Sequence, residues 1–327
     1  MTLQPAPFYD DVADGPEGGA AYWCTTQDGV RIRVGYWPCD NATGTVLLFP
    51  GRTEFVEKYG AAAADLGRRG FATIAIDWRG QGLADRLLPD RRVGHVLDFP
   101  DYQHDVAAAV DLARALGAPE PWHLIGHSMG GAIGLRAALQ ELPVETCAFT
   151  GPMWGIYMSA LVRPFGWALP RVANLVGMGN RLPPSTTYES YVMAKPFEGN
   201  MLTTDTDMYA FMQRQLASYP DLGLGGPSLI WLREGLEECK YLSRQASPDL
   251  PCICFLGAQE RIIDTAAVAD RMRRWPGGEL DVVAGAEHEV MMENATIRAR
   301  VFDRMADLFS GRYRPDSASG DLSVKTA

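Results

Sequence analysis

The sequence predicts an α/β protein built on a mostly parallel central sheet flanked by helices. Short apolar stretches alternate along most of the chain with longer stretches of helical periodicity. Glycine, proline and polar residues gather directly after the apolar stretches. Neighbouring parallel strands need a crossover between them, so this alternation is typical of a parallel sheet with right-handed connections. A chain of 327 residues, 47% of them hydrophobic, is long enough to bury a large core.

Turn and cap residues set the limits of the expected elements. Asp28-Gly29 between two alternating stretches predicts a hairpin, and Gly70 ends the first helix. The first half is expected to hold the hairpin 22–26 and 30–37, strands 45–49, 71–76, 122–125 and 144–149, and helices 56–69, 102–116 and 131–140. The second half is expected to end with strand 252–256, helix 265–274, strand 279–283 and helix 296–309.

The alternation stops in the middle of the chain. Residues 152–247 look helical and irregular and are rich in aromatic residues and methionine, which predicts a helical cap or lid insertion. An insertion directly after a strand of the sheet is well placed to roof a site there. The expected organisation is therefore an extension at 1–20, a core at 21–151 and 248–310, the cap at 152–247 and a polar, disordered tail at 311–327.

The motif Gly126-His127-Ser128-Met129-Gly130 fills the turn between an expected strand and an expected helix. Glycines two residues away on both sides allow a tight, strained turn that holds the Ser128 hydroxyl clear of the sheet. The following helix begins there, and its free N–H groups favour negative charge. This setting is typical of the nucleophile elbow of serine hydrolases. The other interpretation is a glycine-rich turn whose serine caps the helix.

A nucleophilic serine needs a histidine that takes up its proton. His288 follows the last expected strand, at the carboxyl end of the sheet where Ser128 also lies. The other histidines fit this role less well: His95 and His104 fall in or near a surface loop, His123 lies inside a buried strand, and His127 is assigned to packing or turn structure. We therefore predict His288 as general base and acid.

The acid that orients His288 is expected after the preceding strand. Glu260 and Asp264 both lie there, and both satisfy the chain order serine, acid, histidine. The pattern of residues alone does not decide which of these two carboxylates orients His288.

Two backbone N–H groups are predicted to bind the oxyanion. One belongs to Met129, directly after the nucleophile, and the other to Arg52, in the loop after strand 45–49. The sequence does not decide whether the Arg52 side chain faces the pocket or lies on the surface.

Composition limits the cellular setting and the partners. The net charge of −10 argues against binding of nucleic acid and against electrostatic attraction to anionic membranes. The six cysteines show neither disulfide-like nor ligand-like spacing, and residues 1–19 lack a signal-peptide pattern, so a cytoplasmic location is expected. The predicted chemistry requires no metal and no cofactor.

Several of these segments together resemble the α/β-hydrolase family, and within it the monoacylglycerol lipase and lysophospholipase L2 group. The matching segments are Pro50-Gly51-Arg52-Thr53-Glu54, residues 77–82, Gly126-His127-Ser128-Met129-Gly130-Gly131, residues 259–264, Glu287-His288-Glu289 and, in the cap, residues 222–232. Monoacylglycerol lipases carry His-Gly in place of Pro50-Gly51 and aspartate in place of Glu260, whereas lysophospholipase L2-like sequences are similar to this chain at both points. The resemblance thus implies Glu260 as the triad acid and leaves Asp264 as a helix N-cap.

These observations predict an ester hydrolase that works through an acyl-enzyme. The resemblance implies a single-chain acyl ester as substrate, held in an apolar pocket for which Trp154, Tyr157, Met201 and Tyr209 are the candidate lining residues. Contact of residues 152–176 with a lipid surface is a second interpretation of Trp154, Phe165 and Trp167, besides packing inside the cap. The alternative functions are a short-chain carboxylesterase, a proline-iminopeptidase-like peptidase using Glu189, Glu198, Asp205 or Asp207, and a non-catalytic binding protein.

Overall fold

The computed structural model describes residues 3–313 except 160, 162 and 185. Its centre is a nine-stranded sheet in the order β1-β2-β3-β5-β4-β6-β7-β8-β9. The strands are β1 (Gln4–Ala6), β2 (Ala20–Thr25), β3 (Arg31–Trp37), β4 (Gly44–Phe49), β5 (Phe71–Asp77), β6 (Trp122–His127), β7 (Thr146–Thr150), β8 (Cys252–Gly257) and β9 (Glu279–Val283). The pairs β1–β2, β2–β3 and β3–β5 are antiparallel. All further pairs along the sheet, from β5–β4 to β8–β9, are parallel.

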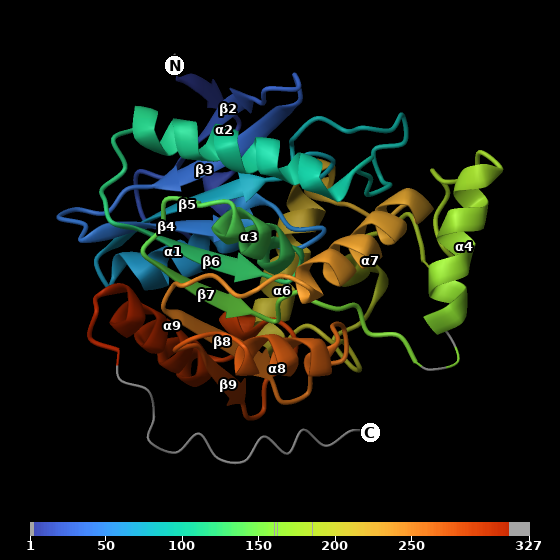
Figure 1. Cartoon of the computed structure of the whole chain (residues 1–327). Helices are drawn as coiled ribbons and strands as arrows, with labels where there is room; N and C mark the ends of the chain where they lie inside the picture. The colour runs from blue at the N-terminus through green and yellow to red at the C-terminus, as the bar shows by residue number, and fades with distance from the viewer. Residues whose placement is uncertain (1–2, 160, 162, 185, 314–327) are drawn as a thin grey trace.

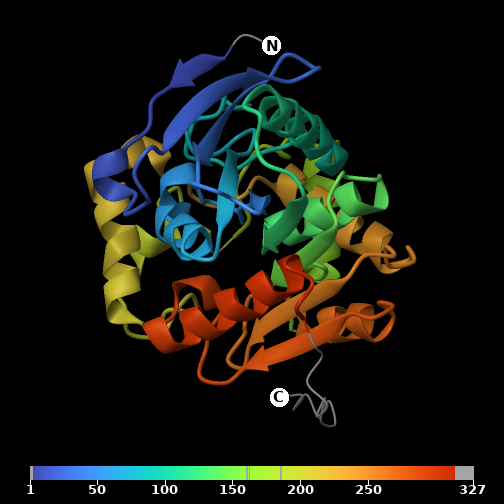
Figure 2. The same ribbon diagram turned by 90° about the vertical axis from the view of Figure 1, so that its left-hand side faces the viewer.

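Helices cover both faces of the sheet (Figures 1 and 2). Against one face lie α2 (Tyr102–Ala115), α3 (Met129–Leu139) and α8 (Thr265–Arg273), whose apolar residues share one buried cluster with β4, β6 and β8. Against the other face lie α1 (Gly60–Gly67) and α9 (Ala295–Phe309), which share a second cluster with the opposite sides of the same strands. Alternating side chains of each strand thus serve two cores, as a sheet buried on both faces requires.

The prediction of an α/β protein with a mostly parallel sheet is confirmed, and each expected strand and helix of the two core segments is present within a few residues. The N-terminus differs from the prediction. The sequence assigns residues 1–20 to an extension, whereas Gln4–Ala6 form β1, paired antiparallel with β2. Pro5 obscures this strand in the sequence, although an edge strand tolerates proline because one of its sides needs no hydrogen bonds.

Between residues 152 and 247 the described residues form four α-helices. They are α4 (Arg163–Leu175), α5 (Tyr191–Ala194), α6 (Thr206–Ser218) and α7 (Leu229–Ser243). Side-chain N-caps start two of them: Asp205 Oδ1 accepts from Met208 N at 2.8 Å, and Ser228 Oγ accepts from Trp231 N at 3.0 Å. Figure 1 shows α4 at the margin of the molecule, apart from the sheet and beside α7.

Two further expectations concern the thiols and the tail. All six cysteines are unpaired, and five of them are buried. The predicted disordered tail lies, from residue 314 on, outside the described residues. Among the described helices, none combines the length and the apolar character that crossing a bilayer would require.

Candidate active site

Ser128 lies on a strained turn between β6 and α3. Its φ of 50° falls in the left-handed region, which a residue with a side chain rarely adopts. Glycine at position 130 makes the turn feasible, because a Cβ there would lie 2.0 Å from the Phe49 carbonyl oxygen. The main chain holds the turn from both sides: Ser128 N donates to Thr150 O at 3.0 Å, and Ser128 O accepts from Met153 N at 2.8 Å. The hydroxyl is thus presented above the carboxyl ends of β6 and β7.

His288 contacts Glu260 directly. Its Nδ1 lies 2.6 Å from Glu260 Oε2, and both side chains are buried. The other carboxylate oxygen of Glu260 accepts from the N–H groups of Ile262 and Ile263 at 2.7 and 3.2 Å. Burial opposes both charges, yet each partner's charge outweighs it: the pKa of the Glu260 carboxyl lies below its usual range and that of His288 above it. The contact occupies Nδ1 and leaves Nε2 as the nitrogen available to a serine proton.

Asp264, the alternative acid, has a different position. Its Oδ1 accepts from Ala266 N and Ala267 N at 3.1 and 3.2 Å and caps α8. The geometry thus separates the two carboxylates that the pattern of residues left open: Glu260 contacts His288, and Asp264 begins a helix.

Ser128 and His288 line one cavity of about 250 Å³. Core segments contribute Arg52, Thr53, Glu54, Phe55, Lys58, Ser128, Ile262, His288 and Glu289, and the segment predicted as a cap contributes Ser190, Tyr191, Val192, Met201, Leu202, Met212 and Leu216. Within the described residues no hydrogen bond joins the Ser128 hydroxyl to the imidazole. Such bonds are often long in an enzyme without substrate and tighten when the substrate binds.

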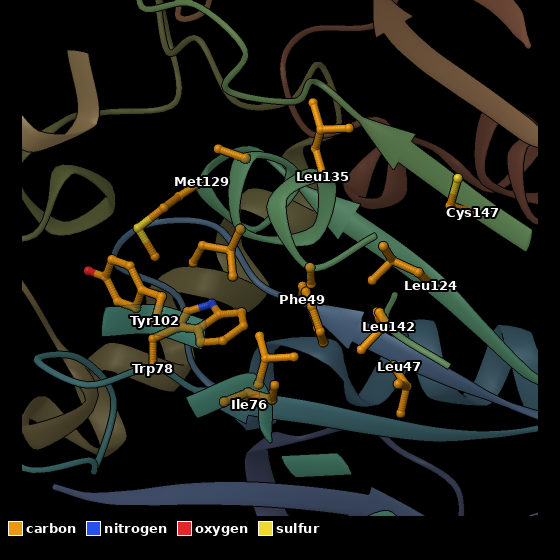
Figure 3. Close-up of a cluster of buried hydrophobic side chains, with 14 of the residues drawn as sticks. Leu47, Phe49, Ile76, Trp78, Tyr102, Leu124, Met129, Leu135, Leu142 and Cys147 are labelled. Carbon is orange, nitrogen blue, oxygen red and sulfur yellow. The ribbon is translucent and has the colours of Figure 1, made fainter. Parts of the chain in front are cut away.

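The two predicted oxyanion donors have free N–H groups. Neither Met129 N nor Arg52 N donates a hydrogen bond to a described residue. The Met129 side chain is buried, and Figure 3 shows its sulfur turned towards Tyr102 in the core. Only the backbone of Met129 is therefore free to act at the site.

A cluster of buried charges supports the loop that carries Arg52. Glu54 accepts a hydrogen bond from Gly51 N and another from Tyr59 at 2.5 Å, and its second oxygen lies 2.7 Å from Lys58 Nζ. The same ammonium lies 2.5 Å from Glu289 Oε2. Burial opposes the charges, but Lys58 together with His127 holds the pKa of Glu54 below its usual range, and the two carboxylates raise the pKa of Lys58. We call Glu54, Lys58 and Glu289 the buried charge cluster; the sequence did not predict it.

Glu54 and Glu289 of the buried charge cluster, together with His127, are placed so that they could hold a cation. One donor atom each of Glu54, His127 and Glu289 lies within 4.8 Å of the others, which is close enough for a shared metal ion. The ammonium of Lys58 already contacts both carboxylates of this group. The protein therefore supplies its own cation at this position.

Residues 200–204 of the predicted cap are bonded to the loop that carries His288. The backbone of His288 donates to Met201 O at 3.4 Å, and that of Glu289 donates to Leu202 O at 2.8 Å. Thr203 Oγ1 donates to Met292 O at 2.7 Å, and Thr204 N donates to the Glu293 carboxylate at 3.1 Å. Residues 200–204 and the loop that carries His288 thus form one hydrogen-bonded unit.

The four candidate substrate-binding residues lie in different places. Met201 lines the cavity. Trp154 is buried between Phe149 and Trp275 beneath the elbow, and Tyr209 is buried inside the cap segment, where its hydroxyl donates to Lys195 O. Tyr157 is 57% exposed at the surface. Apart from Met201, the prediction therefore named residues that do not line this cavity, because composition does not reveal which way an aromatic ring faces.

Three of the remaining histidines, His95, His123 and His127, have structural contacts. His123 is stacked on Phe309 in the core, and burial lowers its pKa to about 4. His127 bonds through Nδ1 to the carbonyl and the hydroxyl of Thr150. His95, expected near the surface, is instead buried against Ser228 Oγ at 2.8 Å, because residues 220–228 cover its loop.

Comparison with known proteins gives a consistent result. A family model described as serine aminopeptidase, S33, matches residues 40–295. Lysophospholipase L2 of Escherichia coli K12 is 30% identical over 321 residues, covering 92% of this chain and 89% of its own. Monoglyceride lipase of Saccharomyces cerevisiae is 24% identical over 305 residues, covering 85% and 89%. The crystal structure of a soluble variant of that yeast lipase with a substrate analog superposes with a TM-score of 0.68 at 21% identity, covering 96% of this chain and 97% of the other.

Proposed function

The chain belongs to the serine aminopeptidase S33 family of α/β-hydrolases and is an ester hydrolase, and from this premise we propose that it cleaves single-chain acyl lipids through an acyl-enzyme formed on Ser128. The activity is of the lysophospholipase and monoglyceride lipase type. The observation that carries the assignment of residues is the buried contact of 2.6 Å between His288 Nδ1 and Glu260, together with the cavity that His288 and Ser128 both line.

In the proposed mechanism His288 Nε2 takes the proton of Ser128 while the serine oxygen attacks the ester carbonyl. The developing oxyanion receives hydrogen bonds from Met129 N and Arg52 N. His288 then gives its proton to the leaving alcohol, and water repeats the sequence to release the fatty acid. Glu260 fixes the imidazole tautomer through Nδ1 and stabilises the imidazolium, while its second oxygen is held by two backbone N–H groups.

The test is hydrolysis as a function of acyl-chain length, with monoacylglycerols and lysophospholipids as substrates and Ser128→Ala as the blank. Six of the cavity-lining residues from the predicted cap and the core loops are large and aliphatic or sulfur-containing: Val192, Met201, Leu202, Met212, Leu216 and Ile262. This apolar wall favours long chains. We expect the rate to rise to long chains and to vanish in the variant. A maximum at two to four carbons would identify a short-chain carboxylesterase instead, and covalent labelling by a fluorophosphonate separates either enzyme from a non-catalytic binding protein.

The peptidase alternative has less support. Of the four cap carboxylates considered for binding a free amine, none is among the residues that line this cavity, and Asp205 caps α6. The carboxylates that do line it, Glu54 and Glu289, are paired with Lys58. Comparing free and amine-blocked peptides tests this alternative directly.

We also propose that residues 152–247 act as a cap whose helix α4 contacts lipid surfaces. One face of α4 and its flanks exposes large apolar side chains at helical spacing: Leu161, Phe165, Leu169, Val172 and Val176. The opposite side faces α7, where Arg171 pairs with Glu237 and stacks on Trp167. A continuous exposed apolar face of this kind is typical of helices that lie in a membrane interface.

The lipid contact is tested by sedimentation with phosphatidylcholine vesicles, which carry no net charge and so report apolar attachment. Phe165→Asp combined with Val172→Asp should abolish co-sedimentation. Leu97→Asp, which changes an equally exposed apolar residue elsewhere, should not. Equal binding of the double variant would remove the proposal. The six unpaired cysteines support a cytoplasmic location.

A further inference from the structure

Arg52 is one of the residues that line the cavity with Ser128 and His288, and its side chain extends from the loop whose backbone N–H is the proposed oxyanion donor. Its Nη1 donates to Gly225 O in the predicted cap at 2.9 Å, and its Cζ lies 5.6 Å from the centre of the Trp231 ring. The guanidinium is thus held in one place, between the core and the segment above it.

Arg52 has no carboxylate partner among the described residues. Of its five N–H donors only one, on Nη1, is bonded to a described residue. The other cation of the cavity, Lys58, is bonded to Glu54 and Glu289, so these two carboxylates are already engaged. Burial lowers the pKa of Arg52 to about 10, so the group remains charged at neutral pH without a counter-ion. A partly buried cation with free donors at the edge of a substrate cavity is typical of a site for an anion.

The position of Arg52 relative to the reaction centre restricts the kind of anion. An ester carbonyl bound by Arg52 N and Met129 N lies at the base of the Arg52 side chain. In a lysophospholipid the phosphate is separated from the ester by only the glycerol carbons and two oxygens, a span that the arginine side chain matches. The acyl chain then lies against the apolar wall of Met201, Leu202 and Met212.

We propose that the Arg52 guanidinium binds the phosphate of a single-chain lysophospholipid, and that this contact makes the enzyme prefer phosphate-bearing substrates over neutral monoacylglycerols. The proposal rests on the function proposed above and adds the residue that selects the head group. Arginine suits this role because its planar fork of donors matches two phosphate oxygens at once.

The experiment uses a matched pair of substrates, lysophosphatidic acid and monoacylglycerol with the same acyl chain, which differ only in the phosphate. The readout is the ratio of the two kcat/KM values within one variant, so any general loss of activity cancels. For Arg52→Met we expect this selectivity ratio to fall by about 10- to 100-fold, as loss of a charge-assisted hydrogen bond predicts. Arg52→Lys keeps the charge but loses the planar fork of donors, so its selectivity ratio should lie between those of the wild type and Arg52→Met. Arg91→Met removes an exposed arginine from the adjacent loop and should leave the ratio unchanged.

Several outcomes would overturn the proposal. One is an unchanged ratio in Arg52→Met, which would make Arg52 only a strut between the core and Gly225. Another is an equal fall in Arg91→Met, which would mean that the overall charge acts. A third arm adds millimolar inorganic phosphate: if it competes with the lipid while the ratio stays unchanged in Arg52→Met, the site takes free phosphate and not a lipid head group.

Failure of the proposed function has a different signature, because the wild-type protein would then hydrolyse neither lipid. In that case the dissociation constants of both lipids for Ser128→Ala, read from tryptophan fluorescence, replace the rates. Weaker binding of lysophosphatidic acid alone when Arg52→Met is added would support the phosphate site without any turnover. An equal effect on both lipids would overturn it.

Discussion

Replacing Lys58 by methionine tests whether the buried charge cluster is balanced as its geometry indicates. The change removes the ammonium that lies 2.7 Å from Glu54 and 2.5 Å from Glu289, and it keeps an unbranched side chain of similar length. Two carboxylates no more than 4.8 Å apart then face each other without a cation. At an effective dielectric constant of about 20, their mutual repulsion is at least about 3.5 kcal/mol.

This repulsion makes the loss of stability depend on pH. The folded variant takes up a proton on the carboxylate pair at higher pH than the unfolded chain does. A group whose proton affinity is raised by folding contributes its stability at low pH and loses it as the pH rises. We therefore expect Lys58→Met to lose about 3 to 4 kcal/mol of unfolding free energy at pH 8 and clearly less at pH 5.5, in line with the 3–5 kcal/mol typical of breaking a buried pair.

Urea unfolding followed by tryptophan fluorescence at the two pH values measures this effect. Lys240→Met is the matched control: its half-exposed ammonium lies 3.5 Å from Glu237 where α7 faces α4, and its loss should cost no more than about 0.5 kcal/mol at either pH. A loss below about 1 kcal/mol for Lys58→Met at pH 8, or the same loss at both pH values, would refute the reasoning.

Three further predictions concern the site itself. Glu260→Gln should lower kcat by about 1,000- to 10,000-fold, because the amide favours the wrong imidazole tautomer. The kcat of Asp264→Asn should remain within about threefold of the wild-type value, since asparagine also caps helices. Steady-state kinetics on one ester checks both variants. The acid limb of the kcat/KM profile should lie above pH about 6.5, because the pKa of His288 is raised and only the neutral imidazole accepts the serine proton. Glu289→Gln removes part of the cause of this shift and should move the limb to lower pH; an unmoved limb would contradict the assignment. Gly151→Ala should abolish activity, since φ is +47° there and the new Cβ would lie 2.9 Å from His288 Nδ1; full activity with an unchanged fold would show that the loop gives way.

The residues that follow strands were predictable from the sequence. Ser128 directly follows one strand, Glu260 and His288 lie in the loops that follow two others, and the carboxyl ends of parallel strands meet at one edge of the sheet. The order of elements was sufficient for that placement. Separating Glu260 from Asp264 was not possible from spacing, because one loop holds both within five residues, and only the backbone path shows which carboxylate turns towards the histidine.

The buried charge cluster could not be predicted because it depends on packing between distant parts of the chain. Glu54 and Lys58 are close in sequence, but Glu289 reaches them from the loop after the last strand. One signal was present: charged residues next to the apolar Phe55 and Val56 have to be paired if the segment is buried. The packing of the predicted cap was harder still to predict, because its aromatic residues do not repeat with a period that identifies an inner and an outer face.

The bonds between residues 200–204 and the histidine loop have a consequence for changing the specificity of this enzyme. Exchange of the proposed cap for that of a relative is the obvious route to a new acyl-chain preference, since this segment supplies Met201 and Leu202 to the wall of the cavity. The same two residues hold the main chain of His288 and Glu289. A chimera that replaces the proposed cap alone would alter the acyl-chain preference and displace His288, the proposed general base, at the same time. Residues 200–204 and 285–293 therefore have to be transplanted as one piece.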